Sequence, residues 1–118
     1  MSCKDREAQR QIRKFEEFFQ QNFDHLCMNL SYHANREITV YCHRDEALNE
    51  VTTFQQKCIA YLLENRFVTD GNSYVRSERE YTIRWFIGSP IKTPLSSYTK
   101  RGTWHCDLLV EVSDVIAC

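Results

Sequence analysis

Glycine and proline are scarce in this sequence, with three and two residues among 118. Because these residue types make most tight turns, their scarcity argues against an all-β sandwich rich in short hairpins. Three glycines also leave little room for a loop that cradles a phosphate, and neither a phosphate-binding loop nor a dinucleotide fingerprint occurs. The H-E-x-x-H pair, paired C-x-x-C motifs and the serine nucleophile elbow are missing as well. We therefore expect no cofactor.

Long apolar runs are absent too. No 18 apolar residues follow one another, so the sequence predicts no transmembrane helix. No apolar stretch follows the charged N-terminal residues, so we expect no signal peptide. Without an export signal, the expected compartment is the reducing cytoplasm, and the cysteines are interpreted as free thiols rather than disulfides. The six cysteines are Cys3, Cys27, Cys42, Cys58, Cys106 and Cys118.

The overall composition is that of an ordinary globular protein. Hydrophobic residues make up 42% and charged residues 26% of the chain, which argues against long disordered regions. A length of 118 residues is typical of one domain. The longest polar stretch with glycine and proline covers residues 88–102, so no linker divides the chain. We therefore predict a single domain over residues 1–118.

Two segments have the periodicity of amphipathic helices. Residues 4–23 place apolar side chains at steps of three and four, which stacks them on one face. The apolar stripe is Ala8, Ile12, Phe15, Phe19 and Phe23, and the charged face is Lys4, Arg6, Glu7, Arg10, Arg13, Lys14 and Glu17. A second helix is predicted from a cap at Asp45 to Asn65. Its stripe is Ala47, Val51, Phe54, Cys58 and Leu62, widened by Leu48, Ile59 and Leu63.

Residues 26–33 and 38–43 alternate apolar and polar side chains, as half-buried strands do. The apolar residues of both segments are even-numbered, so both sets face one core when even positions pair with even positions. We predict a hairpin closed by the three-residue loop 34–36. Its register pairs Tyr32 with Ile38, Leu30 with Val40, Met28 with Cys42 and Cys27 with His43.

The second half of the sequence predicts strands alone. Phe67 and Val68 follow the second helix, and Asp70-Gly71-Asn72 is a strong turn signal. Residues 81–87 are apolar on both faces, as in a central strand, and residues 104–112 alternate cleanly. The predicted order is α-β-β-α-β-β-β. Such a chain indicates an α+β fold, with an antiparallel sheet and two helices packed on one face.

Neighbouring cysteine and histidine residues raise two chemical hypotheses. The doublets Cys42-His43 and His105-Cys106 could bind zinc, but adjacent strand residues point to opposite faces, so buried thiols beside solvated imidazoles are favoured. Cys27 opposite His43 could form a reactive pair, because opposed strand residues lie about 5 Å apart. A Cys–His enzyme also needs an orienting group and an oxyanion hole, and neither is evident. We predict no metal site and no catalytic residues.

A basic and aromatic segment covers residues 76–104. Six basic residues outnumber two acidic ones there, and aromatic residues accompany them, so the segment could bind single-stranded nucleic acid. The basic residues are Arg76, Arg79, Arg84, Lys92, Lys100 and Arg101, and the nearby aromatic residues are Tyr74, Tyr98 and Trp104. The pI of 6.4 is far below the basic values of most nucleic-acid-binding domains, and a solvated face explains the same pattern.

These observations favour a non-enzymatic protein that binds another macromolecule, because aromatic residues make up 13% of the chain and no catalytic set is assembled. The leading hypothesis is a small regulator or inhibitor that acts by protein–protein contact, as phage and viral proteins do on host proteins. A nucleic-acid-binding protein using residues 76–104 is the alternative, and a Cys–His enzyme is a remote one. The candidate binding residues are Tyr41, His43, Arg76, Arg79, Arg84, Tyr98, Lys100 and Arg101.

Self-association is predicted from the strand at residues 104–112. This strand comes last, so we expect it at a sheet edge, where Leu109 points outward beside modestly protective charges. Two copies that pair there about a two-fold axis would form a homodimer and bury Leu109. In the alternative, this strand inserts between earlier strands and leaves residues 67–68 or the hairpin at the edge.

Overall fold

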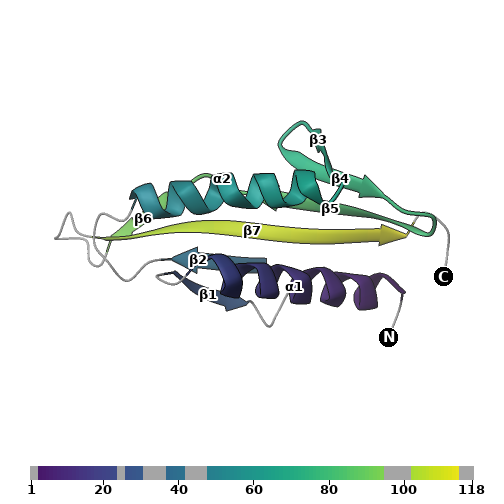
Figure 1. Cartoon of the computed structure of the whole chain (residues 1–118), viewed down its shortest axis with the longest axis horizontal. Coiled ribbons are helices and arrows are strands. Elements are labelled where there is room, and N and C mark those ends of the chain that lie inside the picture. The colour runs from purple at the N-terminus through teal and green to yellow at the C-terminus, as the bar shows by residue number, and fades with distance from the viewer. Residues whose placement is uncertain (1–2, 24–25, 31–36, 42–47, 95–101, 115–118) are drawn as a thin grey trace.

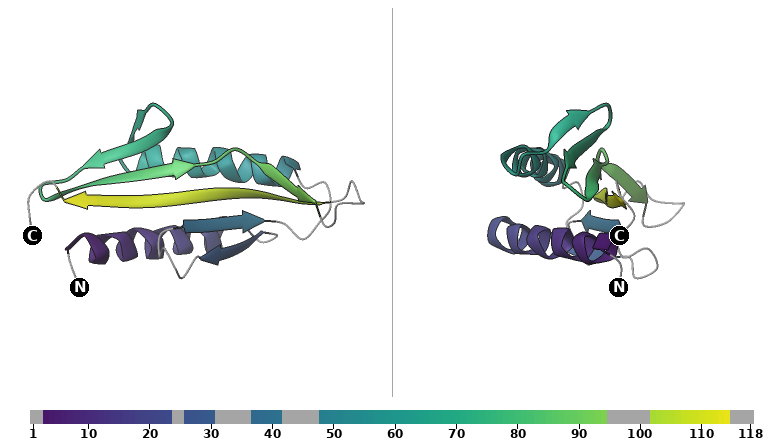
Figure 2. Two further views of the ribbon diagram at one scale, coloured as in Figure 1. Left: turned by 180° about the vertical axis from the view of Figure 1, so that it is seen from behind. Right: turned by 90° about the vertical axis from the view of Figure 1, so that its right-hand side faces the viewer.

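The computed structural model describes residues 3–23, 26–30, 37–41, 48–94 and 102–114, and it has the predicted α+β class. Two helices cover one face of a seven-stranded antiparallel sheet (Figures 1 and 2). The predicted order of elements is confirmed, and the structure adds strands β4 and β6. The elements are α1 (Cys3–Asn22), β1 (Cys27–Leu30), β2 (Glu37–Tyr41), α2 (Leu48–Glu64), β3 (Val68–Asp70), β4 (Ser73–Ser77), β5 (Tyr81–Ile87), β6 (Ile91–Pro94) and β7 (Gly102–Asp114).

The buried side of α1 carries the predicted apolar stripe together with two polar residues. Its buried apolar residues are Ala8, Ile12, Phe15 and Phe19, and Phe23 packs against the same core just beyond the helix. Glu7 and Gln11 are buried as well, so the prediction that Glu7 faces solvent was wrong. A carboxylate tolerates such burial when hydrogen bonds and a counter-charge compensate it, which is the case for Glu7.

The buried side of α2 is narrower than predicted. Val51, Phe54, Cys58 and Leu62 are buried, which confirms the central stripe. Leu48 and Leu63 were expected to widen this stripe, but their exposed fractions are 38% and 49%. The expected cap Asp45 and the stripe residue Ala47 lie outside the described residues.

Aromatic rings fill the space between the two helices. Phe54 on α2 lies 6.3 Å from Phe15, 6.1 Å from Phe19 and 5.0 Å from Phe23, measured between ring centroids. Phe18 and Tyr61 stack at 4.4 Å on the outer side of this cluster. Because large rings bury much apolar surface and pack edge to face, this cluster holds both helices against the sheet and against each other.

The end of α2 adopts a Schellman motif although no glycine stands there. Phe67 N donates to Leu62 O at 3.0 Å and Arg66 N donates to Leu63 O at 3.2 Å. Arg66 takes the left-handed conformation with φ of 68°, a position at which glycine is usual. The predicted turn that follows β3 is confirmed: Gly71 has φ of 61°, and Asp70 pairs with Ser73. This places a type II′ turn at Gly71-Asn72.

Strand β7 lies inside the sheet rather than at its edge. The strand order is β1-β2-β7-β5-β4-β3, and β6 also pairs with β7. Leu109, expected to point from an exposed edge, is paired with Glu37 on one side and with Phe86 on the other. The edge prediction was therefore wrong, and its alternative holds: β1 and β3 end the sheet. The homodimer predicted through this strand loses its structural basis.

The β1–β2 hairpin keeps the predicted parity but is shifted by two residues. Met28 pairs with Val40 and Leu30 with Ile38, whereas we had predicted Val40 opposite Leu30. Even positions still pair with even positions, so Ile38 and Val40 face the core. The shift places Cys27 opposite Tyr41, so the predicted pairing with His43 was wrong. Tyr32, Cys42 and His43 themselves lie outside the described residues.

A β-bulge separates β5 from β6. Ile87 pairs with Leu108 and Ile91 with His105, so three residues, 88–90, lie opposite two residues of β7. The Gly88 carbonyl turns inward and accepts from Gln55 Nε2 at 3.2 Å and from the Cys106 thiol at 3.1 Å. The extra residue reverses the alternation, so that Ile91 points to the face opposite to Ile87.

Candidate functional site

Within the described part of the chain, one face of the sheet carries no helix. Seen along the long axis in Figure 2, α1 and α2 lie together on one side of the strands. On that side the buried residues of β7 are Cys106, Leu108, Val110 and Val112. Because strand residues alternate and register partners share a face, the residues between them and their partners point the other way. We call this side the open face, and its β7 residues are His105, Asp107, Leu109, Glu111 and Ser113.

An apolar patch occupies the middle of the open face. Leu109 pairs directly with Phe86, and Tyr41 and Ile91 flank His105 on its two sides. Ile91 is 52% exposed and is the most exposed of these four apolar residues. The apolar patch therefore consists of two pairs, Phe86 with Leu109 and Tyr41 with Ile91 beside His105, and Thr39 and Asp107 lie between the two pairs.

A shallow hollow of 430 Å³ opens beside this patch. It lies beside the bulge at Gly88 that separates β5 from β6, and its outward lining includes Glu37, Thr39, Phe86, Gly88, Asp107 and Leu109. A side chain added at Gly88 would bring Cβ to 3.0 Å from the Asp107 carbonyl oxygen. Glycine at position 88 thus allows the close backbone approach that shapes this hollow.

Hydrogen bonds fix the polar residues beside the hollow. Asp107 Oδ1 accepts from Thr39 Oγ1 at 3.0 Å and lies 3.2 Å from His105 Nδ1. An ionised carboxylate can only accept, so this contact orients the imidazole with a proton on Nδ1. Two strands thereby position one carboxylate, which stays about half exposed to solvent.

Acidic residues predominate among the exposed charges of the open face. Glu37, Asp107 and Glu111 are all exposed. The arginine of this face, Arg84, is held by Asp70, whose Oδ2 lies 2.9 Å from Nη1, and it also donates to Ser73 Oγ. Arg84 is therefore largely neutralised, and the described part of the face presents a net negative charge.

The structure does not gather the predicted binding residues into one surface. Tyr41 and Arg84 lie on the open face, and Arg79 is exposed between β4 and β5. Arg76 pairs with Ile83 on the helix-bearing side, where Nε lies 2.7 Å from Glu78 Oε1, Nη1 donates to Asn65 O, and the guanidinium lies 4.9 Å from the centre of the Phe67 ring. The remaining candidates lie outside the described residues: His43, Tyr98, Lys100 and Arg101.

The described cysteines do not form a catalytic arrangement. Cys27, Cys58 and Cys106 carry free thiols, and the last two are buried. Burial raises the pKa of the Cys106 thiol to about 12 and raises the pKa of Cys58 as well. A thiol with a raised pKa is a poor nucleophile at neutral pH. Within the described ranges, no three His, Cys, Asp or Glu side chains gather closely enough to hold a metal ion.

A second hollow, of 290 Å³, lies between the end of α1 and the first half of α2. Phe23 and Leu26 form its apolar wall, while Glu50 and Lys57 bring opposite charges. The Lys57 ammonium already lies 5.5 Å from the centre of the Phe23 ring. With its charges balanced, this hollow has no feature that selects a ligand.

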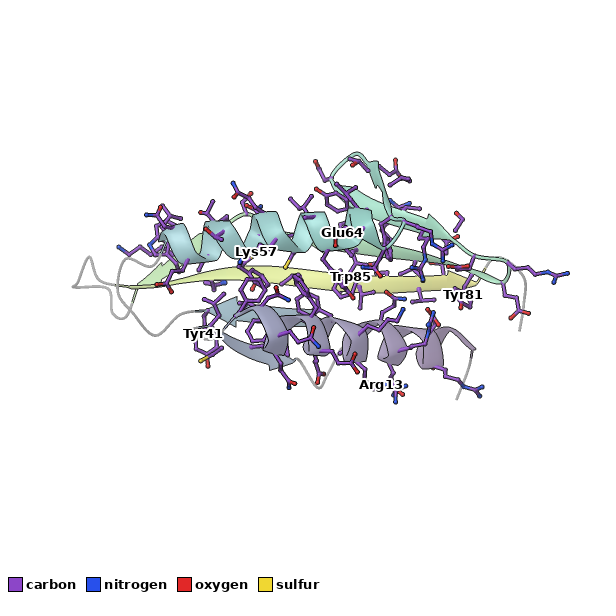
Figure 3. The ribbon with its side chains drawn as sticks, in the orientation of Figure 1. Arg13, Tyr41, Lys57, Glu64, Tyr81 and Trp85 are labelled. Carbon is purple, nitrogen blue, oxygen red and sulfur yellow. The ribbon has the colours of Figure 1, made fainter. Side chains whose placement is uncertain are left out.

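A buried polar network joins α1 to β5. Arg10 donates to Glu7 through Nε at 2.8 Å and Nη2 at 2.7 Å, and Gln11 Nε2 donates to Glu7 Oε1 at 3.0 Å. Trp85 Nε1 donates to Gln11 Oε1 at 3.5 Å, and Tyr81 also hydrogen-bonds Glu7. Figure 3 shows Trp85 near the middle of the molecule and Tyr81 at the end where α1 begins. These bonds satisfy the polar groups that the helix buries.

The apolar patch contains residues that the sequence reasoning did not select. Phe86 lies in the segment 81–87 predicted as a central strand, in which apolar residues are expected on both faces. Ile91 was not selected, because the bulge that turns its side chain outward leaves only a weak signal in the sequence, the turn-forming residues Gly88-Ser89-Pro90. Leu109 had been selected, but as part of an edge.

Comparison with known proteins gives no match: no protein-family model, curated protein or solved structure corresponds to this chain. Neither described helix is long and apolar enough to cross a membrane.

Proposed function

We propose that this protein binds another protein through its open face and acts as a small regulator or inhibitor, without catalytic chemistry of its own. The observation that carries the proposal is the apolar patch of Tyr41, Phe86, Ile91 and Leu109. A sheet with one solvated face ordinarily carries polar side chains there. Apolar side chains on an exposed face, with charged residues beside them, are typical of protein–protein interfaces.

The charges of the open face favour a protein partner over a nucleic acid. Phosphate contacts supply most of the affinity for nucleic acids and require accessible Lys or Arg side chains. Of the basic residues predicted for that role, Arg76 and Arg84 are held in ion pairs, and Glu37, Asp107 and Glu111 repel phosphate. An apolar patch with an acidic rim supports contact with a protein instead.

A pair of matched substitutions tests the proposal. Ile91 on the open face and Leu63 on α2 are aliphatic residues with nearly equal exposed fractions, 52% and 49%. Lysine at either position disturbs the core little, because both side chains already reach solvent. The experiment isolates bound proteins from cells that produce the chain natively. It uses three tagged proteins, the wild type and the variants Ile91→Lys and Leu63→Lys. Mass spectrometry then quantifies the proteins bound to each.

The proposal expects a protein that copurifies with the wild type and with Leu63→Lys but is lost from Ile91→Lys. Circular dichroism and thermal melts of the three proteins confirm equal folding. Equal recovery of every bound protein by all three would refute the open face as the binding surface. Salt-sensitive retention on single-stranded DNA that Ile91→Lys leaves unchanged would favour the nucleic-acid alternative.

A further inference from the structure

The dimensions of the apolar patch limit what can cover it. The patch extends over β2, β7 and the strands β5 and β6 on the other side of β7, hence two inter-strand spacings or about 10 Å. Along β7, it extends from the register of His105 to that of Leu109, four residues or about 13 Å, and Glu111 lies two residues further, about 20 Å from His105. An α-helix is about 10 Å wide, and about 14 residues extend 21 Å. The patch together with Glu111 thus has the width and length of one helix.

The backbone of β7 is already paired on both sides. It pairs with β2 on one side and with β5 and β6 on the other. A partner cannot add a strand to β7, because strand addition needs a free edge, and the edges of the described sheet lie at β1, β3 and β6. It must pack through side chains, as α1 and α2 do on the opposite side of the same strands.

The exposed charges around the patch are unbalanced. Glu37 is next to Leu109 on β2, while Asp107 and Glu111 lie two residues to either side of Leu109 on β7. A second copy of the open face would bring these carboxylates against like charges, which opposes a face-to-face homodimer. Lysine or arginine side chains on the side of a covering helix that faces the sheet would neutralise Asp107 and Glu111, and one at its border would neutralise Glu37.

We infer that the occupant of the open face is a basic amphipathic helix of another protein, with aliphatic or aromatic residues over the apolar patch and Lys or Arg beside Glu37, Asp107 and Glu111. This inference rests on the proposed function and specifies the chemistry of the partner. The helix would lie along β7, with its apolar stripe on Leu109, Phe86 and Ile91.

Two synthetic helices test this inference directly. Each has about 14 residues with a leucine stripe, one with lysine and the other with glutamate on the remaining positions. Fluorescence anisotropy measures their binding to the protein at about 20 mM and about 150 mM NaCl. The lysine peptide should bind about tenfold more tightly than the glutamate peptide, with the difference shrinking at the higher salt concentration.

Matched charge reversals locate the binding. The double variant Glu37→Lys, Glu111→Lys should weaken binding of the lysine peptide about tenfold, and Ile91→Lys should weaken it similarly. The control Glu17→Lys, Glu64→Lys alters net charge equally, but its exposed residues lie on the helices. It should change the affinity less than about twofold. Equal binding of the two peptides, or equal effects of the two double variants, would overturn the inference.

Other occupants give distinct results. Displacement of the lysine peptide by single-stranded DNA would overturn the inference in favour of a nucleic acid. A dimer in light scattering that Ile91→Lys dissociates would overturn it in favour of a second copy. If the cellular partner is lost from Ile91→Lys but retained by Glu37→Lys, Glu111→Lys, the basic helix is refuted and the proposed function stands.

Discussion

Replacement of Glu7 by glutamine tests the buried network between α1 and β5. The Glu7 side chain is 7% exposed and accepts hydrogen bonds from Arg10, Gln11 and Tyr81. Burial by itself raises the pKa of this carboxyl, but the hydrogen bonds from Arg10 and Gln11 outweigh it and bring the pKa below its usual value. The ionised form is therefore the one that the folded protein stabilises.

The magnitude follows from these contacts. Arg10 is 46% exposed and three residues from Glu7, so their ion pair contributes about 0.5 kcal/mol. Hydrogen bonds to a buried charged group contribute about 1.5–3 kcal/mol, and glutamine retains one acceptor while turning an N–H donor toward other donors. We expect Glu7→Gln to lower the free energy of unfolding by about 1–3 kcal/mol, which in a domain of this size lowers Tm by about 3–5 °C per kcal/mol.

The pH dependence has a definite sign. A carboxyl whose pKa is lower in the folded state adds stability above its unfolded pKa, near 4.5, and loses it as the pH falls through the folded value. The stability difference between wild type and Glu7→Gln should be full at about pH 7 and shrink below about pH 4. Urea unfolding followed by tryptophan fluorescence measures it, with the exposed Glu17→Gln as control. A difference that is absent at pH 7, or constant down to pH 3, would refute the ionised network.

Three further predictions test other parts of the fold. Leu62→Ala truncates a side chain that is 2% exposed and should lower the free energy of unfolding by about 2–5 kcal/mol, as measured by denaturant titration. An unchanged denaturation midpoint would show that the apolar stripe of α2 is not part of the core. Arg66→Gly should raise stability by about 0.5–1 kcal/mol, because glycine suits φ of 68° without strain, and a lower Tm would contradict the left-handed helix end. In native protein, iodoacetamide should modify Cys27 faster than Cys106, whose pKa burial raises to about 12; mass spectrometry showing equal rates would contradict that burial.

The sequence sufficed for those features that depend on local periodicity. The steps of three and four in α1 and α2 identified the residues facing the sheet, because a helix with one apolar stripe has one way to bury it. Period two gave the correct faces of β2 and β7, since alternation determines which side chains point inward. The turn at Gly71 was recognised because few residues adopt its backbone conformation readily.

Features that depend on contacts between segments far apart in the sequence could not be predicted from local sequence patterns. The register of β1 and β2 was shifted by two residues, because a shift of two keeps every side chain on its face and the apolar pattern does not distinguish the two registers. The interior place of β7 follows from pairings with β2 and β5, which no local pattern encodes. The sequence predicted Glu7 on the solvent-exposed side of the helix, because its contacts with Gln11 and Tyr81 become evident only in the folded structure. Of the predicted binding residues, Tyr41 and Arg84 lie on the open face, whereas Ile91, which was not selected, is turned to that face by the bulge.

The interior position of β7 has a consequence for how the chain folds. Among the described strands, β7 alone joins β1–β2 to β5–β4–β3, so the two parts of the sheet share no pairing until residues 102–114 are in place. The pairing of β2 with β7 connects residues about 70 positions apart, such as Thr39 with Asp107. Such nonlocal contacts give a high contact order and slow folding. Until β7 has been synthesised, the sheet surface that α1 and α2 cover is incomplete, a period in which chaperones and aggregation compete for the chain.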